Sequence, residues 1–211
     1  MYKYVKRILD IIVSIVILIV FGIPMCIIAF LIWNEDKGSP LFIQDRMGKD
    51  HKPFRMYKFR SMKQERNGGN MTHEEMCTNI GKFLRKTSLD ELPQIFNVLK
   101  GEMSFIGPRP WVLEYYDWMT PEQQRRISVR PGVTGLAQVK GRNGISVLQK
   151  IAYDLEYVDN FGLKYDLKIL FLSVKVVLKE ENAEITEMGI SEELKVLESN
   201  SKSKKKIKNT D

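Results

Sequence analysis

The chain has 211 residues, enough for one domain and a membrane element but too few for two full domains. Its 33 lysines and arginines outnumber its 26 acidic residues, and the formal net charge of +7 predicts anionic partners such as nucleic acid, acidic lipid headgroups or phosphorylated small molecules. Cys26 and Cys77 have no metal-ligand spacing and exclude a disulfide framework, so we expect two reduced thiols.

An apolar run without any charged side chain covers residues 11–33. As a helix it would reach about 34 Å, whereas a bilayer core is about 30 Å thick. The run is too long for the apolar part of a signal peptide, and no small-residue cleavage site follows it. We therefore expect residues 1–36 to form a membrane element that is not cleaved off.

Two arrangements of this element remain open from physics alone. One is a single helix that spans the bilayer. The other is a re-entrant hairpin, because Pro24 in the middle of the run, two residues after Gly22, would break or bend a helix there. Basic residues flank both ends of the run, and the positive-inside bias would draw both ends to the cytoplasm.

The rest of the chain has the pattern of a mainly α fold with a small β element (α+β). Two short strands are predicted at 41–44 and 54–59, around a turn at 48–50. The predicted helices cover residues 80–85, 88–100, 121–126, 147–160 and 163–179. The last of these could pack in the core or lie on the bilayer surface. Residues 181–211 are polar and lysine-rich, and we expect a disordered tail that touches acidic lipid.

Two adjacent carboxylates, Asp90 and Glu91, are the first candidates for chemistry. Ser88 is predicted to cap a helix, with Glu91 in capping-box register. Both acids could simply be favourable first-turn residues. However, Arg85 and Lys86 precede them, and phosphoryl transfer needs positive charge around the transferring oxygens, usually with a divalent metal. Carboxylate oxygens suit Mg²⁺.

A second candidate is Arg109, which lies between Pro108 and Pro110. The two prolines restrict the backbone, and the guanidinium offers a rigid fork for phosphate oxygens. The alternative is a rigid turn with a solvated charge. Loops at 130–135 and 140–144 could bring backbone close to a nucleotide, although neither fits a P-loop or a dinucleotide-binding pattern.

Taken together, these segments resemble the bacterial sugar transferase family, the small monotopic phosphoglycosyl transferases. The resemblance extends from Lys6 to about Glu180. The blocks that carry it are residues 6–10, 44–48, 57–62, 88–94, 97–101, 103–110, 130–139 and 141–143.

The resemblance implies an activity. Members transfer a sugar-1-phosphate from a UDP-sugar to polyprenyl (undecaprenyl) phosphate, giving a polyprenyl diphosphate sugar and UMP, in the first membrane step of glycoconjugate or polysaccharide synthesis. By this resemblance Asp90 forms a covalent phosphosugar ester with Glu91 as its partner, Mg²⁺ binds at Asp90, and Arg85 and Arg109 hold phosphate. The residues implied near the nucleotide or substrate are Pro131, Gly132, Thr134, Gln138 and Arg142. From their place at the end of the second predicted strand, Lys58 and Arg60 could line the same site, contact lipid headgroups or lie on a solvated strand face.

The resemblance also implies a re-entrant element bent at Gly22 and Pro24, and a cytosolic phosphoglycosyl transferase domain over 37–180. The enzyme would lie on the cytoplasmic face of the bacterial inner membrane, contact acidic lipid headgroups, supply downstream glycosyltransferases and bind no nucleic acid. One departure is Ile23, which stands where the family often has a serine before the bend proline.

Some questions stay open at this level. The UDP-sugar is not identified, nor is the pathway, whether capsule, lipopolysaccharide, exopolysaccharide or protein glycosylation. A single apolar run argues against a polytopic phosphoglycosyl transferase. A membrane-anchored basic adaptor without catalytic activity is the alternative from another class, and it would tolerate loss of the Asp90 carboxylate.

Overall fold

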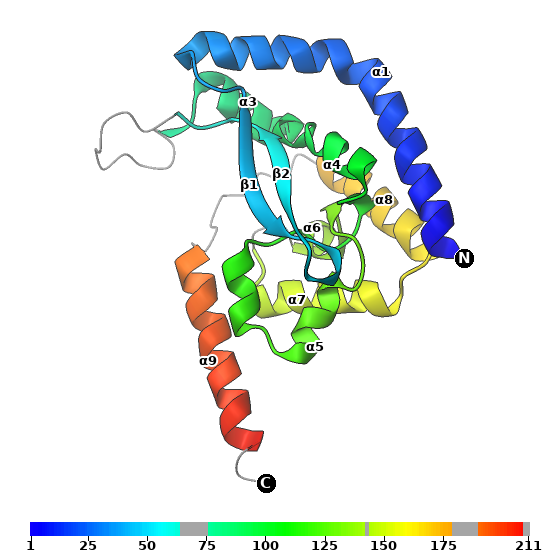
Figure 1. Ribbon diagram of the computed structural model, residues 1–211, viewed down its shortest axis with the longest axis vertical. Helices are drawn as coiled ribbons and strands as arrows, with labels where there is room; N and C mark the ends of the chain where they lie inside the picture. The colour runs from blue at the N-terminus through cyan, green and yellow to red at the C-terminus, as the bar shows by residue number, and fades with distance from the viewer. Residues whose placement is uncertain (64–75, 142–143, 179–189, 209–211) are drawn as a thin grey trace. The chain divides into compact units, whose positions relative to one another are not determined.

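The computed structural model describes residues 1–63, 76–141, 144–178 and 190–208 (Figure 1). The chain divides into two compact units. Unit 1 comprises Met1–Lys6, Asp45–Phe54 and Glu102–Asp211, and unit 2 comprises Arg7–Gln44 and Arg55–Gly101. The described residues are mostly helical, with two small two-stranded sheets, β1–β2 and β3–β4. The predicted mainly α fold with a small β element is therefore confirmed.

The N-terminal apolar run forms one helix, α1 (Tyr2–Asp36), which contains Pro24. Its stretch Tyr2–Glu35 is long and apolar enough to cross a membrane, and only 11% of its most apolar window is buried. The helix changes direction along its length (Figure 1). Proline has no N–H for the carbonyl of Val20, four residues earlier, and this gives a physical cause for a bend without a break. The re-entrant hairpin stays a prediction.

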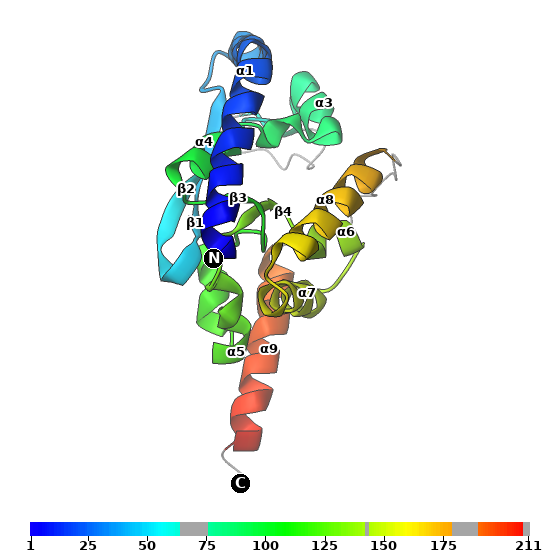
Figure 2. The same cartoon turned by 90° about the vertical axis from the view of Figure 1, so that its right-hand side faces the viewer.

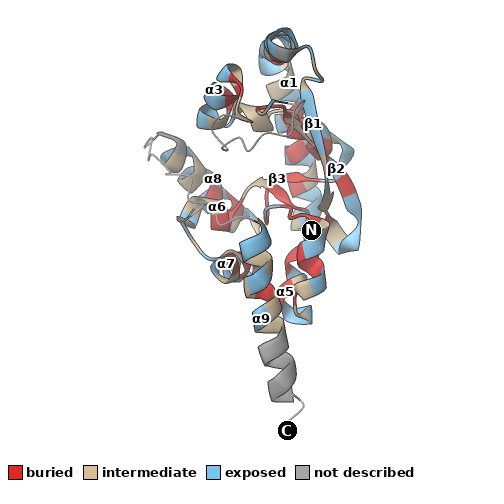
Figure 3. Ribbon diagram, turned by 90° about the vertical axis from the view of Figure 1, so that its left-hand side faces the viewer, coloured by how far each residue is buried: buried red, intermediate tan, exposed pale blue. Residues whose placement is uncertain are grey.

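The inner face of α1 belongs to the core of unit 2. Met25 and Ile32 of α1 are buried together with Phe59 and with Leu84 of α3 (Asn79–Thr87). Leu84 is fully buried, and burial of such a side chain stabilises the fold by about 1.5–3 kcal/mol. Much of the remaining surface of α1 is exposed (Figure 3).

Unit 2 also contains most of the predicted pair of strands. β1 (Leu41–Met47) pairs with β2 (Pro53–Phe59), and a short 3₁₀ turn, η1 (Lys49–His51), joins them. Asp50 and His51 in this turn have φ values of 53° and 57°. The two strands and the turn were predicted from the sequence and are confirmed.

The helix predicted to start at Ser88 is wrong at its start. Ser88 has φ 56° at the end of α3, and its side chain makes no capping hydrogen bond. A 3₁₀ turn, η2 (Leu89–Glu91), follows, and the α-helix α4 (Gln94–Lys100) begins only after Pro93. Pro93 has no N–H to donate to Leu89, so an α-helix cannot run through this position without losing a bond. Gly101, at φ 86°, ends α4.

Unit 1 contains a parallel pair of strands that the sequence did not predict. β3 (Ser104–Ile106) pairs with β4 (Gly132–Thr134), with Ser104 opposite Gly132 and Ile106 opposite Thr134. Each strand has only three residues, too few for an alternating pattern to be read. The elements between them are η3 (Leu113–Trp118), α5 (Pro121–Gln124) and η4 (Arg125–Ile127).

Three helices follow β4 and pack together in unit 1 (Figure 2): α6 (Leu136–Gly141), α7 (Val147–Asp159) and α8 (Leu163–Leu178). The last two were predicted almost to the residue. Ile169 of α8 is fully buried with Tyr157 of α7. The opposite side of α8 exposes large apolar side chains, those of Leu163, Leu167, Leu170, Phe171 and Val174.

The C-terminal segment differs from its prediction. Part of the expected disordered tail forms α9 (Ile190–Lys208). Leu197 is fully buried in a core cluster with Trp111 and Tyr115, and Glu193 accepts a 2.6 Å hydrogen bond from the Tyr115 hydroxyl. A few apolar residues at helical spacing therefore order a segment whose overall composition is polar. Contact of its lysines with acidic lipid stays a prediction.

The packing of α3 generates a test with a matched control. A Cβ atom on Gly81 would lie 2.0 Å from the Ser61 carbonyl oxygen, whereas one on Gly22 would meet no atom within 4 Å. We expect Gly81→Ala to lower the free energy of unfolding by about 1–3 kcal/mol, because the backbone must shift. Gly22→Ala should be at least as stable as the unmodified chain. Thermal unfolding in detergent measures both, and equal melting temperatures would contradict the close approach.

Candidate active site

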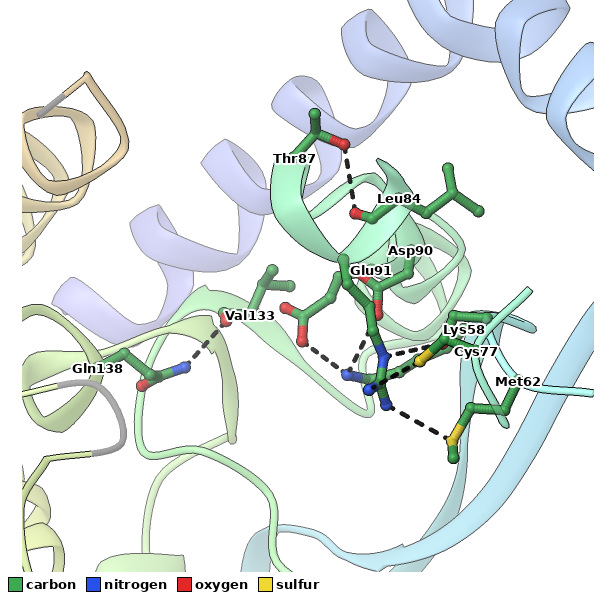
Figure 4. Close-up of polar contacts among 11 residues, drawn as sticks. Lys58, Met62, Cys77, Leu84, Thr87, Asp90, Glu91, Val133 and Gln138 are labelled. Atoms are coloured by element: carbon green, nitrogen blue, oxygen red, sulfur yellow. Dashed lines mark hydrogen bonds and ion pairs between the residues drawn. The ribbon is translucent and has the colours of Figure 1, made fainter. Parts of the chain in front are cut away.

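The acidic pair predicted from the sequence lies beside a predicted lysine. Asp90 and Glu91 are in η2, with side chains 13% and 18% exposed. Lys58 of β2 donates a 2.7 Å hydrogen bond from Nζ to Glu91 Oε1, and its Nζ lies 4.0 Å from Asp90 Oδ2 (Figure 4). One ammonium group thus offsets part of the repulsion between two neighbouring carboxylates.

The orientation of the acidic pair follows from the leucines on either side of it. Leu89 and Leu92 pack against the core cluster of unit 2. The intervening turn is closed by backbone hydrogen bonds of 3.2 Å from Glu91 to Ser88 and from Leu92 to Leu89. With the leucines turned into the core, the two carboxylates of the turn are directed toward Lys58.

Arg85 lies in the last turn of α3 and is held by uncharged acceptors. Its Nε donates to Ser61 Oγ at 3.1 Å, and its two terminal nitrogens contact Cys77 Sγ and Met62 Sδ, each at 3.7 Å. Sulfur is a weak acceptor. Among the described residues Arg85 forms no ion pair, so its charge is available to an anion, as the predicted phosphate role requires.

Arg60 follows β2 and is closely packed. It is only 6% exposed, and a Cβ atom on Gly38 would lie 2.1 Å from one of its nitrogens. This close packing favours a structural role for Arg60 over contact with lipid headgroups. Its place near the substrate stays a prediction.

Asn97 of α4 fixes this part of the site, although it was not among the predicted site residues. It is fully buried. Its Oδ1 accepts a 3.1 Å hydrogen bond from the Tyr57 N–H, and its Nδ2 donates to the Arg55 carbonyl at 2.7 Å. The side-chain amide therefore makes the two backbone hydrogen bonds that a neighbouring strand would otherwise make to this part of β2. It holds the backbone of β2 next to Lys58, which directly follows Tyr57. A buried asparagine in a helix facing an unpaired strand edge is not visible as a sequence pattern.

Unit 1 holds the predicted phosphate loop, in which Arg109 is exposed between buried Pro108 and Pro110. Four consecutive carbonyl oxygens of this loop accept hydrogen bonds from different parts of the unit. The acceptors and donors are Pro108 with the Gly132 N–H (2.9 Å), Arg109 with the Arg126 side chain (2.7 Å), Pro110 with the Arg46 side chain (3.3 Å), and Trp111 with the Met47 N–H (3.0 Å). Arg109 is thus an exposed residue on a firmly held backbone.

The second predicted loop lies directly against the first. Besides the bond from Gly132 to Pro108, the Gly107 N–H donates to the Thr134 carbonyl at 2.9 Å. Cβ atoms on Gly132 and Gly135 would lie 2.2 Å and 2.1 Å from backbone atoms of Gly107. These glycines were predicted to let the backbone approach a nucleotide. In the structure they let two loops approach one another.

The other predicted loop residues stabilise the same region. The Thr134 hydroxyl is 2.9 Å from that of Ser173 in α8, and Gln138 Nε2 donates to the Val133 carbonyl at 3.0 Å (Figure 4). The Pro131 carbonyl accepts from the Ser104 N–H at 2.8 Å. Arg142 lies outside the described residues. Substrate contacts by these residues stay predictions.

A buried charged cluster lies beneath the Arg109 loop, and it too was missed. Arg126 is 1% exposed, donates to Asp154 Oδ2 through Nε (2.9 Å) and a terminal nitrogen (2.5 Å), and donates to the Tyr116 hydroxyl at 2.8 Å. Burial raises the pKa of Tyr116, so its hydroxyl stays neutral as an acceptor. Arg125 and Arg126 are adjacent and identical in type, so the sequence does not indicate which of the two side chains is buried.

The acidic pair can be tested for its fit to a divalent cation. No group of three or more His, Cys, Asp and Glu side chains that could hold a metal occurs among the described residues. Mg²⁺ in phosphoryl transfer usually takes one or two carboxylates and completes its shell with water and substrate phosphate oxygens. Asp90 and Glu91, two neighbouring carboxylates on one turn, fit such a partial shell.

Comparison with known proteins identifies the family. The model of the bacterial sugar transferase family matches residues 1–180. The chain belongs to this family. It is 49% identical to an uncharacterized sugar transferase, EpsL, of Bacillus subtilis over 71% of this chain and 75% of EpsL. It is 44% identical to a UDP-glucose:undecaprenyl-phosphate glucose-1-phosphate transferase of Klebsiella pneumoniae over 80% of this chain and 39% of that protein.

Family membership confirms the resemblance found in the motifs and the expected class of enzyme, a transferase. The galactosyl transferase CpsE of Streptococcus agalactiae is 40% identical, over 84% of this chain but 44% of that protein. The chain therefore spans less than half the length of several curated relatives that it matches. The names of these relatives include different sugars, so they do not identify one for this chain.

Asn97 provides a stability test of the site. Asn97→Asp replaces the donor that faces the Arg55 carbonyl with an oxygen, and we expect the free energy of unfolding to fall by about 1–3 kcal/mol because a buried acceptor is left unsatisfied. Asn160→Asp is the matched control. Asn160 makes a similar bond to the Glu156 carbonyl, but it is exposed, and we expect a change within about 0.5 kcal/mol. Urea unfolding of both variants is the measurement, and equal effects would contradict the role of Asn97.

Proposed function

We propose that the chain transfers a sugar-1-phosphate from a UDP-sugar to undecaprenyl phosphate, giving undecaprenyl diphosphate sugar and UMP. The observation that carries the proposal is the Asp90–Glu91 pair bonded to Lys58. It stands in a chain of the bacterial sugar transferase family, and relatives of this chain are named as sugar phosphotransferases acting on undecaprenyl phosphate.

The reaction proceeds in two displacements. A carboxylate oxygen of Asp90 attacks the phosphorus that bears the sugar, and the bond from that phosphorus to the bridging oxygen breaks, releasing UMP. A phosphate oxygen of undecaprenyl phosphate then attacks the same phosphorus. The acyl phosphate bond breaks, and Asp90 returns as a carboxylate. A covalent intermediate allows a soluble donor and a lipid acceptor to use one site in turn.

The neighbouring residues have distinct roles in this proposal. Lys58 donates a hydrogen bond to Glu91 and lies 4.0 Å from Asp90, so its ammonium group offsets the charge of both carboxylates. Arg85 and Arg109 bind phosphate oxygens, for which a guanidinium has matching geometry. Asp90 would hold Mg²⁺, which when bound would neutralise charge on the phosphate oxygens of the donor.

The setting proposed for the reaction is the cytoplasmic face of a bacterial inner membrane. α1 is apolar enough to enter the bilayer, and it contains Pro24, a residue that favours a bend, which supports a re-entrant hairpin. The exposed apolar side of α8, which also carries Lys164, Lys168 and Lys175, suits the interface between acyl chains and acidic headgroups. The lipid-linked product would pass to downstream glycosyltransferases in polysaccharide or glycoconjugate synthesis.

The first test measures UMP release from a panel of UDP-sugars with undecaprenyl phosphate and Mg²⁺. We expect release with one or a few donors and a loss of about 10³-fold or more for Asp90→Asn, because the nucleophile is gone. Asp159→Asn, at an exposed carboxylate, is the control and should retain activity. A folded, membrane-bound chain that releases no UMP from any donor would favour the basic adaptor over the enzyme.

The hairpin is tested by labelling single cysteines from outside intact cells. In a background without Cys26 and Cys77, Lys3→Cys and Ser39→Cys place thiols at either end of α1. A re-entrant hairpin predicts that an impermeant maleimide reaches neither thiol until the membrane is opened, since both ends are cytoplasmic. Reaction of one of the two in intact cells would mean that α1 spans the bilayer.

A further inference from the structure

The buried cluster around Arg126 is tied to the phosphate loop at one atom. Beyond its bonds to Asp154 and Tyr116, Arg126 donates from a terminal nitrogen to the Arg109 carbonyl oxygen at 2.7 Å. Its guanidinium carbon also lies 4.1 Å from the centre of the Trp111 ring. The Arg126 guanidinium is therefore held by hydrogen bonds through its nitrogens and by the Trp111 ring on one face. One of these hydrogen bonds goes to the backbone of Arg109, the exposed arginine.

Stability alone is a weak reason for this arrangement. A buried ion pair is often no more stabilising than apolar side chains of similar volume, because both charges lose their water. Arg126 and Asp154 are each only 1% exposed. A planar guanidinium differs from an apolar group, however, in that it directs several N–H groups to acceptors at fixed angles.

The bond to the Arg109 carbonyl restricts the freedom that the loop still has. Pro108 and Pro110 fix their own φ angles, and a residue before proline is biased toward extended backbone. The orientation of the Arg109 carbonyl then depends mainly on the ψ angle of Arg109. A hydrogen bond from a buried, immobile group sets that angle, and so sets the direction from which the exposed side chain starts.

We propose that Arg126 is a positioning residue for Arg109, with Asp154 and Tyr116 holding Arg126 in place. The inference rests on the proposed function, in which Arg109 binds a substrate phosphate. Arg126 does not touch the substrate. It acts by holding the backbone of Arg109 so that the exposed guanidinium is preorganised for the phosphate.

A double-mutant cycle tests this role on the full chain in detergent or bilayer discs. Arg126→Lys keeps a charge for Asp154 but loses the fork that reaches the Arg109 carbonyl. We expect it to lower kcat/KM for the UDP-sugar by about tenfold. The loss should fall on the same parameter, kcat or KM, that Arg109→Ala changes. In the Arg109→Ala background, Arg126→Lys should cause no further loss.

The matched control is Arg125→Lys, the same substitution one residue earlier. Arg125 pairs with Glu122 and Asp159 at the surface, and kcat/KM should stay within about twofold of the unmodified chain. If Arg126→Lys does not fold, Tyr116→Phe replaces it, since it removes an acceptor of Arg126 and keeps the ion pair. Tyr116→Phe should lower the same parameter, kcat or KM, by a smaller factor. In the Arg109→Ala background it should cause no further loss.

Three results would overturn the inference or separate it from the proposed function. A folded Arg126→Lys chain with unchanged kcat/KM overturns it, as does an equal loss with and without the Arg109 side chain. If the unmodified chain releases no UMP from any donor, the proposed function fails, and hydrogen exchange of residues 104–112 decides whether Arg126 holds the loop. Faster exchange there in Arg126→Lys, with α7 unchanged, supports the positioning, whereas unchanged exchange overturns it.

Discussion

The acidic turn depends on the packing of the apolar N-terminal helix against it. Met25 and Ile32 of α1 share a core with Leu84, and the leucines on either side of the acidic pair pack on the same cluster. Arg7, near the start of α1, donates to the carbonyls of Val98 and Leu99 at the end of α4. The helix that suits a membrane is therefore also a structural part of unit 2, and the turn with the two carboxylates cannot be separated from it.

The candidate charged residues of the two units differ in their burial. In unit 2, Asp90 and Glu91 are mostly buried and are matched by Lys58, whose strand is held by the fully buried amide of Asn97. In unit 1, Arg109 is exposed on a backbone whose carbonyl oxygens are all engaged. The first arrangement offsets the repulsion of a reactive pair of anions, and the second presents a cation without leaving its backbone free.

Proline and glycine explain where sequence patterns succeeded and failed. The break caused by Pro93 was underestimated, so Asp90 was placed at the start of an α-helix when it lies in a 3₁₀ turn. Gly132 was singled out for close approach to a nucleotide, which stays a prediction, whereas the structure shows its close approach to Gly107 in the other loop. In both cases the residue type was informative about the local backbone conformation. The residues that it packs against are distant in the sequence and could not be inferred from the residue type.

The sequence by itself determined the apolar helix, the β1–β2 pair, the helices α3, α7 and α8, the family and most of the candidate residues, because these depend on hydrophobic period, turn chemistry and ordered motifs that are local in the chain. Only the tertiary structure decided which of two adjacent arginines is buried, that Asn97 completes a strand edge, and that a polar C-terminal segment forms α9 around Leu197. These features depend on contacts between residues distant in sequence, and the free energy of such contacts is not encoded in any local pattern.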